Sequence, residues 1–455
     1  MAMNAGSGWR RQPRGTLAAT LLSSVALLAL GGLLASSSSA AAPPGRAAAD
    51  QLEWVVSVFN GSSAPSAAVL QRHFTPGFLN AVPRQQLLEA FYPEWSNRPV
   101  KLQTITNVPA GAVATVATRN ARFRLSVTVE PTGSHRINGL LLQPAALKLT
   151  SWRAIDGALS RLGTHAALDV GSPDGKTIHA LNAAEPLAIG SAFKLYVLGA
   201  LAEAIEKGKA GWDERLAISD AHKSLPSGSM AYERSGTVHS LRDFAARMIS
   251  VSDNTAADHL IARLGRAAVE RQLVALGNHT PGLDKPFLTT RELFALKIAA
   301  PAPLRGAYAR ADSARRLALL PQIDALTPTL ADAAGWSTPR LIDKVEWFAS
   351  TSDLTRAISA LVARSAQPGL APLKTILALN PGFAVDRSDW PYVAYKGGSE
   401  PGVFSQTWYL ERHDGARFTV SLIVNDPHHQ VDEITAEAIG QAVIAKLAAN
   451  VRPVK

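Results

Sequence analysis

Strand-like segments lie on both sides of a long helical region after residue 150, and this arrangement constrains the fold most. The first two segments are joined by the turn sequence Gly171–Gly175, which suits a hairpin. The last two are joined around Asp414-Gly415. The split predicts an α+β fold with one antiparallel sheet and a helical block. The predicted strands are Ala166–Val170, Thr177–Ala180, Tyr392–Lys396, Phe404–Leu410 and Phe418–Val424.

A helix is predicted at each end of this region. The apolar residues from Trp152 to Leu162 share one helical face, and Gly163 is placed to end the helix. A final helix is expected from about Val431 to Ala449. We therefore expect one domain over residues 150–455. Inside the helical block, three glycines suit helix ends, namely Gly208, Gly265 and Gly277.

The preceding region, residues 50–148, has a different pattern. Helical stretches are expected first, and the stretch around Ile105 is not a clean strand. Two segments then alternate with the period of half-buried strands. This order of elements resembles the cone-shaped α+β domains of steroid isomerases and polyketide cyclases. No His/Asp pair stands out, so we expect a non-catalytic packing or binding module. The expected helices are Leu52–Phe59, Ala67–Phe74 and Gln85–Phe91, and the strands are Ala114–Thr118 and Phe123–Val129.

Residues 1–42 have the pattern of an export signal. Three arginines precede an uncharged apolar stretch from Leu17 to Ala35, and small residues follow up to Ala42. We expect cleavage and an exported protein, in the periplasm, cell envelope or medium. The alternative is an uncleaved anchor, which would be the only means of membrane association. The Arg10-Arg11 pair permits twin-arginine export but lacks the usual apolar context.

Composition excludes several kinds of chemistry. The chain of 455 residues has no cysteine, so it has no disulfide, thiol nucleophile, cysteine-zinc site or iron–sulfur cluster. The formal charge of +10 comes from scattered basic residues, which does not favour nucleic-acid binding. No phosphate-binding glycine motif is found. The adjacent His428 and His429 near Asp426 form a weak metal candidate because neighbouring side chains point apart. We expect no metal and no cofactor.

The sequence Ser191-Ala-Phe-Lys194 stands where the second predicted strand gives way to a helix. A serine at a helix start lies beside unpaired backbone N–H groups, and a lysine three residues later is one turn along the same face. A serine hydroxyl needs a neighbouring base to act as a nucleophile, and a buried lysine can serve. Alone, this motif also fits an N-cap with a solvated lysine.

Two further motifs make the pattern specific. Ser252-Asp253-Asn254 lies between two predicted helices, and Lys396-Gly397-Gly398-Ser399 ends one late strand. Small residues there would let a substrate backbone lie against the strand edge. In this order, the three motifs resemble those of class A β-lactamases and penicillin-binding proteins. The resemblance covers residues from about 150 to the C-terminus and implies a β-lactamase/transpeptidase-like fold.

The resemblance also implies a role for each motif residue. Ser191 would be the acylating nucleophile and Lys194 its base. Ser252 would relay a proton to the leaving group, and Asn254 would bind the substrate amide. Lys396 would supply positive potential for a substrate carboxylate and disfavour the proton on Lys194. The substrate would lie along Gly397, Gly398 and Ser399, with the backbone N–H groups of Ser191 and Ser399 as the oxyanion hole.

The sequence departs from the family at three places. Gly397 stands where threonine or serine is usual, which removes a hydroxyl that would touch the substrate carboxylate. The loop glutamate of class A enzymes is not found; Asp284 is the nearest acid, and Glu292 is better read as a carboxylate at a helix N-terminus. Gln406 stands where a basic residue is expected.

The extra residues between Asn254 and Lys396, together with the N-terminal module, resemble two-domain serine hydrolases related to mycobacterial lipoproteins and a clavulanate-cluster protein. We predict an exported serine hydrolase that forms an acyl-enzyme on a small β-lactam, ester or related acyl substrate. The alternatives are a D-alanyl-D-alanine peptidase and a catalytically weak penicillin- or ligand-binding protein.

Overall fold

The computed structural model describes residues 45–82, 87, 99–108, 111–118, 122–145, 147–225, 227–329, 332, 336–383 and 385–449. The predicted signal at residues 1–42 lies outside them, as does the expected helix at residues 85–91 apart from Leu87. No helix within the described ranges is long and apolar enough to cross a membrane.

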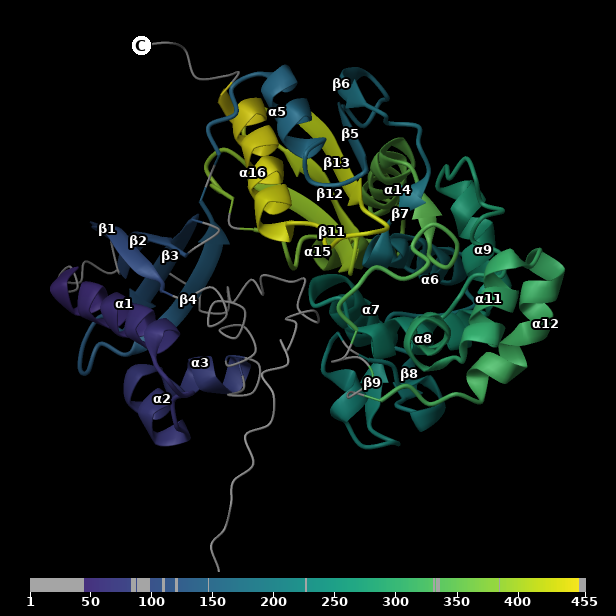
Figure 1. Ribbon diagram of the computed structural model, residues 1–455, viewed down its shortest axis with the longest axis horizontal. Coiled ribbons are helices and arrows are strands. Elements are labelled where there is room, and N and C mark those ends of the chain that lie inside the picture. Colours follow the sequence, from purple (N-terminus) through teal and green to yellow (C-terminus); the bar gives the residue numbers. More distant parts are fainter. Residues whose placement is uncertain are drawn as a thin grey trace, which may run out of the picture.

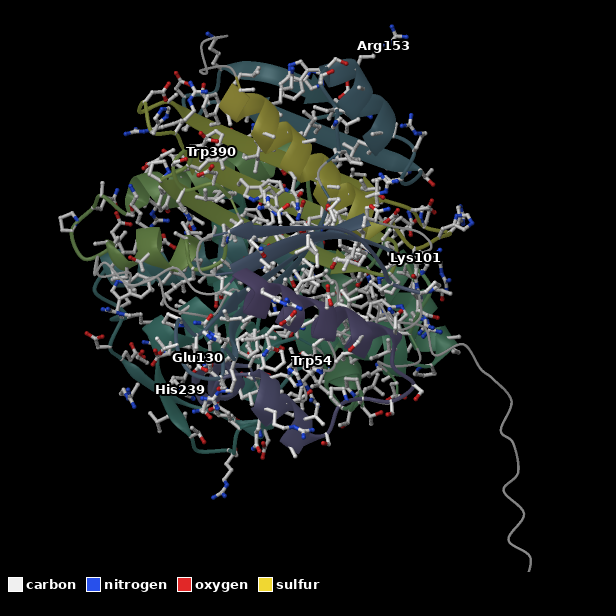
Figure 2. All side chains as sticks on the ribbon, turned by 90° about the vertical axis from the view of Figure 1, so that its left-hand side faces the viewer. Trp54, Lys101, Glu130, Arg153, His239 and Trp390 are labelled. Carbon is white, nitrogen blue, oxygen red and sulfur yellow. The ribbon has the colours of Figure 1, made fainter. Side chains whose placement is uncertain are left out.

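In the N-terminal module, the described residues form helices α1, α2 and α3 and a four-stranded antiparallel meander in the order β1-β2-β3-β4 (Figure 1). Helix α1 packs across the first three strands and buries Leu52, Val55 and Phe59. Trp54 of α1 stacks on His73, with ring centroids 3.6 Å apart (Figure 2). The elements are α1 Gly45–Asn60, α2 Ala67–His73, α3 Pro76–Ala81, β1 Lys101–Val108, β2 Gly111–Ala117, β3 Arg122–Val129 and β4 Ile137–Pro144.

The stretch around Ile105, which was not expected to be a clean strand, forms β1. Most of its side chains are exposed on both faces, so the strand has no clean alternation of polar and apolar residues. Its backbone pairs with β2, where Ile105 lies opposite Ala114. Backbone pairing with β2, and not the sequence pattern of β1 itself, therefore accounts for this strand.

The predicted split sheet is confirmed. Five antiparallel strands lie in the order β11-β12-β13-β5-β6, so the strands from both ends of the region meet where β13 pairs with β5. Helices α5 and α16 cover one face and bury an apolar layer around Trp408 and Ile439. The bounds are α5 Trp152–Leu159, β5 His165–Gly171, β6 Thr177–Leu181, β11 Tyr392–Glu400, β12 Val403–Glu411, β13 Arg417–Asn425 and α16 Glu433–Ala449.

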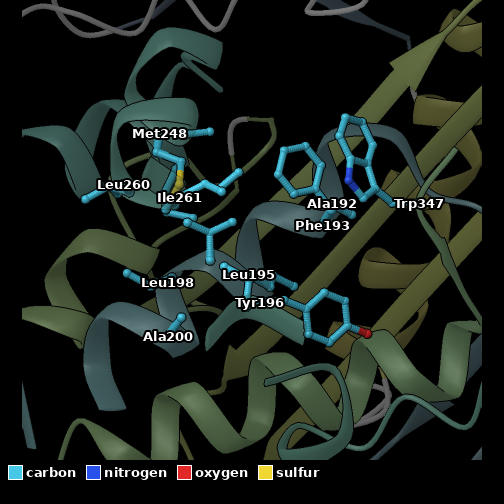
Figure 3. Close-up of a cluster of buried hydrophobic side chains, with 14 of the residues drawn as sticks. Ala192, Phe193, Leu195, Tyr196, Leu198, Ala200, Met248, Leu260, Ile261 and Trp347 are labelled. Carbon is cyan, nitrogen blue, oxygen red and sulfur yellow. The ribbon is translucent and has the colours of Figure 1, made fainter. Parts of the chain in front are cut away.

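The helical block lies on the other face of the sheet (Figure 1). Its centre is α6, which is apolar almost all round and buried against α7, α8, α9 and α14 (Figure 3). The main helices are α6 Lys194–Glu206, α7 Leu241–Ser250, α8 Asn254–Leu264, α9 Arg266–Ala275, α10 Thr290–Phe294, α11 Ala302–Arg310, α12 Ser313–Asp324, α14 Thr351–Arg364 and α15 Pro372–Leu377.

Short elements connect this block to the sheet. The two-stranded ribbon of β7 and β10 holds the chain just before Ser191, because Ile189 N–H donates to Trp347 O at 3.0 Å. The short elements are β7 Leu187–Ala188, β8 Arg215–Ala217, β9 Val238–Ser240, β10 Phe348–Ala349, the 3₁₀ helices η1 Gly190–Phe193, η2 Asp220–His222 and η3 Met230–Tyr232, and the π-helical turn η4 Ala295–Ala299. The predicted combination of one antiparallel sheet and a helical block is confirmed.

Candidate active site

Ser191 lies in the 3₁₀ helix η1, immediately before α6 begins at Lys194. Gly190, with φ of 49°, allows the chain to turn out of the ribbon at this point. The hydroxyl of Ser405 on β12 donates to Ile189 O at 2.6 Å and fixes the same turn from the sheet. The serine is therefore held by both the helical block and the sheet.

Lys194 is fully buried and its side-chain nitrogen lies among four oxygens. Ser191 Oγ and Ser252 Oγ are each 3.0 Å from Nζ. Ser252 O and Asn254 Oδ1 are each 2.6 Å from it. No carboxylate forms an ion pair with Lys194 among the residues that the structure describes.

These contacts suit a neutral amine. The two oxygens at 2.6 Å can only accept, so they take both N–H groups of a neutral lysine. The lone pair is then left for a hydroxyl proton. Burial lowers the pKa of Lys194 from 10.5 to about 7, although the charges of Asp253 and Asp258 act in the opposite direction. Lys194 can therefore accept a proton from Ser191 near neutral pH.

Ser252 lies in the left-handed region of the backbone, with φ of 57°. This conformation is unusual for a residue other than glycine and is typical of functional sites. It directs both the carbonyl and the hydroxyl of Ser252 at Lys194. Ser227 Oγ donates to the same carbonyl at 2.7 Å.

Asp253, the middle residue of the motif, has a structural role that the sequence analysis did not assign. Its Oδ1 caps α8 by accepting Ala256 N–H at 2.9 Å. Its Oδ2 accepts Ser229 N–H at 2.8 Å and Met230 N–H at 2.9 Å. A Cβ at Gly228 would overlap the Asp253 carboxylate, so glycine lets this loop approach closely. An acidic residue just before a helix is the signal that could have predicted the cap.

Lys396 reaches the same hydroxyl from β11, with Nζ 3.0 Å from Ser252 Oγ. Burial and the nearby charge of Lys194 lower the pKa of Lys396 well below its ordinary value. We expected burial and the charge of Lys396 together to lower the pKa of Lys194. Burial is the main cause of the lowered pKa at Lys194, whereas the repulsion between the two lysines lowers the pKa of Lys396.

The strand edge lies directly against the serine. A Cβ at Gly398 would overlap Ser191 N and lie 2.7 Å from Ala192 N. A Cβ at Gly190 would lie 2.9 Å from Ser399 N. Glycine at both places therefore lets this edge of β11 lie close to the backbone of Ser191.

Gly397 faces the other way. Successive residues of a strand point to opposite faces, so its missing side chain would point away from Ser191. The phenol of Tyr395 covers that face, because a Cβ at Gly397 would overlap Tyr395 Oη and lie 2.9 Å from Cζ. The sequence analysis did not single out Tyr395. An aromatic residue two positions before a strand glycine is the signal that could have found it.

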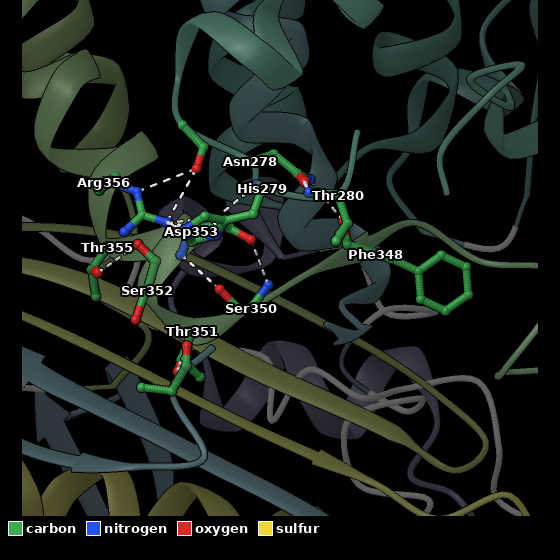
Figure 4. A network of polar contacts seen from close by, with 12 residues as sticks. Asn278, His279, Thr280, Phe348, Ser350, Thr351, Ser352, Asp353, Thr355 and Arg356 are labelled. Carbon is green, nitrogen blue, oxygen red and sulfur yellow. Dashed lines mark hydrogen bonds and ion pairs between the residues drawn. The ribbon is translucent and has the colours of Figure 1, made fainter. Parts of the chain in front are cut away.

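The two acids considered as replacements for the missing loop glutamate have other partners. Asp284 Oδ1 accepts Phe348 N–H at 2.7 Å. The neighbouring Asn278 donates to Phe348 O at 2.9 Å, and both of these residues are labelled in Figure 4. Glu292 forms a capping box with Thr289 at the start of α10 and an ion pair with Arg266 at 2.6 Å. Within the described ranges, neither carboxylate contacts Ser191 or Lys194.

An aromatic cluster packs beside Lys194. Lys194 Nζ is 5.5 Å from the centre of the Phe193 ring. Phe193 and Trp347, both labelled in Figure 3, stack with ring centroids 3.8 Å apart. Phe287 packs edge-on against Phe193, with centroids 5.7 Å apart. All three rings are buried.

The weak metal candidate has a local explanation. Asp426 Oδ1 accepts the backbone N–H groups of His428 at 2.8 Å and His429 at 2.9 Å, which closes a turn after β13. The part of the chain that the structure describes contains no group of three His, Cys, Asp or Glu side chains that could hold a metal ion.

Solved structures give similar folds at low sequence identity. A β-lactamase from Sphaerobacter thermophilus is 18% identical, with 67% of this chain and 100% of that chain covered and a TM-score of 0.48. PBP-A, solved as a mutant acyl-enzyme complex with penicillin G, is 17% identical, with 65% and 96% covered and a TM-score of 0.43. A β-lactamase from Chitinophaga pinensis is 16% identical, with 66% and 98% covered and a TM-score of 0.44.

Family comparisons cover both parts of the chain. No protein with a curated description matches it. The family described as ORF 12 gene product N-terminal matches residues 43–134. The Beta-lactamase enzyme family matches residues 154–451, which include all three motifs. The chain therefore belongs to the β-lactamase enzyme family.

Proposed function

We propose that this protein is a serine hydrolase that forms an acyl-enzyme at Ser191. One observation carries the proposal: the Ser191 hydroxyl lies 3.0 Å from the nitrogen of a buried lysine. Burial lowers the pKa of Lys194 to about 7, so much of it is neutral at pH 7.

The acylation step follows from the contacts. Lys194 Nζ takes the proton of Ser191, and Oγ attacks the carbonyl carbon of the substrate. The backbone N–H groups of Ser191 and Ser399 stabilise the negative oxygen. The bond between the carbonyl carbon and the leaving group then breaks, and Ser252 passes its hydroxyl proton to the leaving group. Protonated Lys194, whose Nζ lies 3.0 Å from Ser252 Oγ, gives Ser252 a proton in return, so that the lysine is neutral again.

A catalytically weak penicillin-binding protein is the second candidate. It is favoured by the buried rings of Phe193, Phe287 and Trp347 near Lys194 and by the lack of a carboxylate contact to Ser191 or Lys194 in the described residues. Without such a base, water attacks the acyl-enzyme slowly.

The test uses a fluorophosphonate probe and a fluorescent penicillin, followed on a denaturing gel. The wild type and Ser160→Ala, a change at an exposed serine after α5, should be labelled equally. Ser191→Ala should not be labelled while its circular dichroism and melting temperature stay unchanged. Equal labelling of Ser191→Ala would contradict the assignment.

We also infer from residues 1–42 that the protein is exported. Expression of the full chain in a bacterium, followed by fractionation and mass spectrometry of the N-terminus, tests this. Cleavage near Ala40 or Ala42 supports export, and an intact N-terminus in the cytosol contradicts it.

A further inference from the structure

A buried ion cluster lies beside the end of β11 and is not used by the acylation step described above. Lys297 of η4 lies between two carboxyl groups, those of Glu346 and Glu400, and these three residues form the Lys297 cluster. Lys297 Nζ is 3.1 Å from Glu346 Oε1 and also donates to Glu400 Oε1. The side chains of Lys297 and Glu346 have no exposed area, and that of Glu400 is 5% exposed. Buried ionisable groups are unfavourable unless they pair, so each member depends on the others.

Glu400 connects the cluster to the strand that lies against Ser191. Lys396, Gly398 and Glu400 alternate along β11, so they point to the same face of the sheet. On that face, a Cβ at Gly398 would overlap Ser191 N. Glu400 is the next residue in this row, about 7 Å further along the strand. Its carboxyl group therefore holds the part of β11 that lies beside Ser191.

Glu346 connects the cluster to the chain segment that supports Ser191 from another side. Its Oε2 accepts the N–H of Trp347 at 2.8 Å. Trp347 O accepts the N–H of Ile189, two residues before the serine, at 3.0 Å. The Trp347 ring stacks on Phe193, two residues after the serine. The cluster thus reaches the Ser191 turn both through β11 and through the Trp347 segment.

Lys297 is held by the turn that carries it. Arg340 donates to Lys297 O, and Arg305 Nη1 donates to Ala300 O at 3.0 Å, directly after η4. The Lys297 ammonium group lies 5.8 Å from the centre of the Trp336 ring. The backbone here is π-helical, a form that is frequent at functional sites. Lys297 therefore gives the two carboxyl groups a common attachment point in the helical block.

The charges of the cluster balance when one carboxyl group keeps its proton. Burial and the charge of Glu346 raise the pKa of Glu400 well above its ordinary value. Glu400 therefore stays protonated at a pH where an ordinary glutamate is ionised, and Lys297 and Glu346 form the charged pair. A protonated carboxyl group still accepts a hydrogen bond from Lys297 and has an O–H to donate to Glu346.

We propose that the Lys297 cluster positions the acylation site: it holds the edge of β11 and the Trp347 segment against the Ser191 turn, so that Oγ meets the substrate carbonyl in the reactive geometry. This rests on the proposed acyl-enzyme function. The members of the cluster act through the backbone around Ser191, so they are positioning residues. Their effect can be large, because a displacement of about 1 Å in an active site can cost ~10²-fold in rate.

Two variants of Glu400 separate hydrogen bonding from space filling. Both leave the charged pair of Lys297 and Glu346 intact, so neither leaves a buried charge alone. Glu400→Gln keeps the hydrogen bonds of a protonated carboxyl group and should keep most of the wild-type rate. Glu400→Leu lacks them and should lower the rate constant of fluorophosphonate labelling at saturating probe at least ~10-fold. The control is Lys344→Met, at a lysine that is 57% exposed, which should behave as the wild type.

The end point and the pH profile of labelling distinguish positioning from a loss of folded protein. In Glu400→Leu the labelled fraction at long times should equal that of the wild type, and the midpoint near pH 7 set by Lys194 should not move. A purely structural defect would lower the labelled fraction and the melting temperature instead. Wild-type kinetics in Glu400→Leu, or an equal loss in Glu400→Gln, would overturn the proposal.

A double variant removes the attachment point itself. Lys297→Met combined with Glu346→Gln leaves no charge unpaired, and buried ion pairs can often be replaced in this way at little cost in stability. This protein should melt near the wild type but be labelled at least ~10-fold more slowly. A wild-type rate would mean that the cluster only balances its own charges.

Hydrogen exchange separates this proposal from the nucleophile assignment, because it needs no reaction at Ser191. Peptides that cover residues 396–404 should exchange faster in Glu400→Leu than in the wild type or in Glu400→Gln. Unchanged exchange in Glu400→Leu would overturn the positioning role. Faster exchange in a protein whose wild type is not labelled by the probe would count against Ser191 alone.

Discussion

Lys194 and Lys396 share one hydrogen-bond partner, the hydroxyl of Ser252, which lies 3.0 Å from each side-chain nitrogen. Both lysines are buried, and neither forms an ion pair with a carboxylate among the described residues. Two positive charges beside the same hydroxyl in a buried site repel each other strongly, so protonation of both lysines at once is unfavourable. The site is therefore arranged to keep at least one lysine neutral, and Ser252 can exchange a proton with either.

The first prediction concerns the pH dependence of acylation. Because the pKa of Lys194 is lowered to about 7, the amine is protonated below this pH and neutral above it. The acylation rate should rise with pH through about 7 and then level off. Lys194→Ala should be slower by at least ~10²-fold, and Lys194→Arg should not restore the rate, since arginine stays protonated.

Stopped-flow acylation between pH 5 and 9 measures this. Lys207→Ala changes an exposed lysine at the end of the same helix and should keep the wild-type profile. A flat wild-type profile together with an active Lys194→Ala protein would show that another group is the base.

The second prediction uses the backbone of Ser252. Its φ of 57° favours glycine, because a Cβ in the left-handed region costs about 1 kcal/mol. Ser252→Gly and Ser252→Ala both lose the hydroxyl and should both lose acylation. The glycine variant should nevertheless be the more stable of the two by about 1 kcal/mol.

Urea unfolding of the two variants gives this difference. Ser250, the last residue of α7, provides the matched comparison. At this position Ser250→Ala should be more stable than Ser250→Gly by up to about 1 kcal/mol, as usual in helices. If Ser252→Ala were also more stable than Ser252→Gly, the left-handed conformation of Ser252 would cost nothing.

The third prediction concerns deacylation. The apolar rings near Lys194 and the lack of a carboxylate contact there should leave a penicilloyl adduct that persists, whereas small esters turn over. Intact-protein mass spectrometry after mixing with a penicillin measures the lifetime, and p-nitrophenyl acetate measures ester turnover.

Asp284 gives this prediction its control. Asp284→Asn removes the carboxyl group but keeps a side-chain oxygen that can accept the Phe348 N–H, so both stability and the lifetime of the adduct should change little. Rapid multiple turnover of penicillin that is lost in Asp284→Asn would refute the structural role assigned to this residue.

The fourth prediction is a stability effect at Glu437. Burial raises the pKa of Glu437 from 4.5 to about 8, and its Oε1 has no hydrogen-bond partner within the described residues. Between these pH values the unfolded chain loses this proton and the folded protein keeps it. The free energy of unfolding should therefore fall as pH rises from about 4.5 to about 8, with a slope of up to about 1.4 kcal/mol per pH unit.

Glu437→Gln removes the titration and keeps the shape of the side chain. Its unfolding free energy should depend less on pH, and the variant should exceed the wild type in stability above pH 7. Chemical denaturation at pH 5 and pH 8 measures both. Parallel pH dependence of the two proteins would show that Glu437 is ionised in the folded state.

The sequence by itself determined the order of strands and helices around the helical block and the three motifs. These follow from local patterns: the turn Gly171–Gly175, the helix-ending glycines, and a serine with a lysine one turn later. Local sequence suffices here because caps, turns and one-turn spacings involve residues only a few positions apart.

Tertiary structure decided what depends on distant segments. Strand β1 exists because β2 pairs with it, although its own pattern is poor. Asp284 is drawn to Phe348, 64 positions away, and Ser252 meets Lys396 across 144 positions. Tyr395 covers Gly397 because packing against Gly382 and Trp408 sets the direction of its ring. Such contacts depend on how separate elements close upon each other, and no spacing along the chain encodes that geometry.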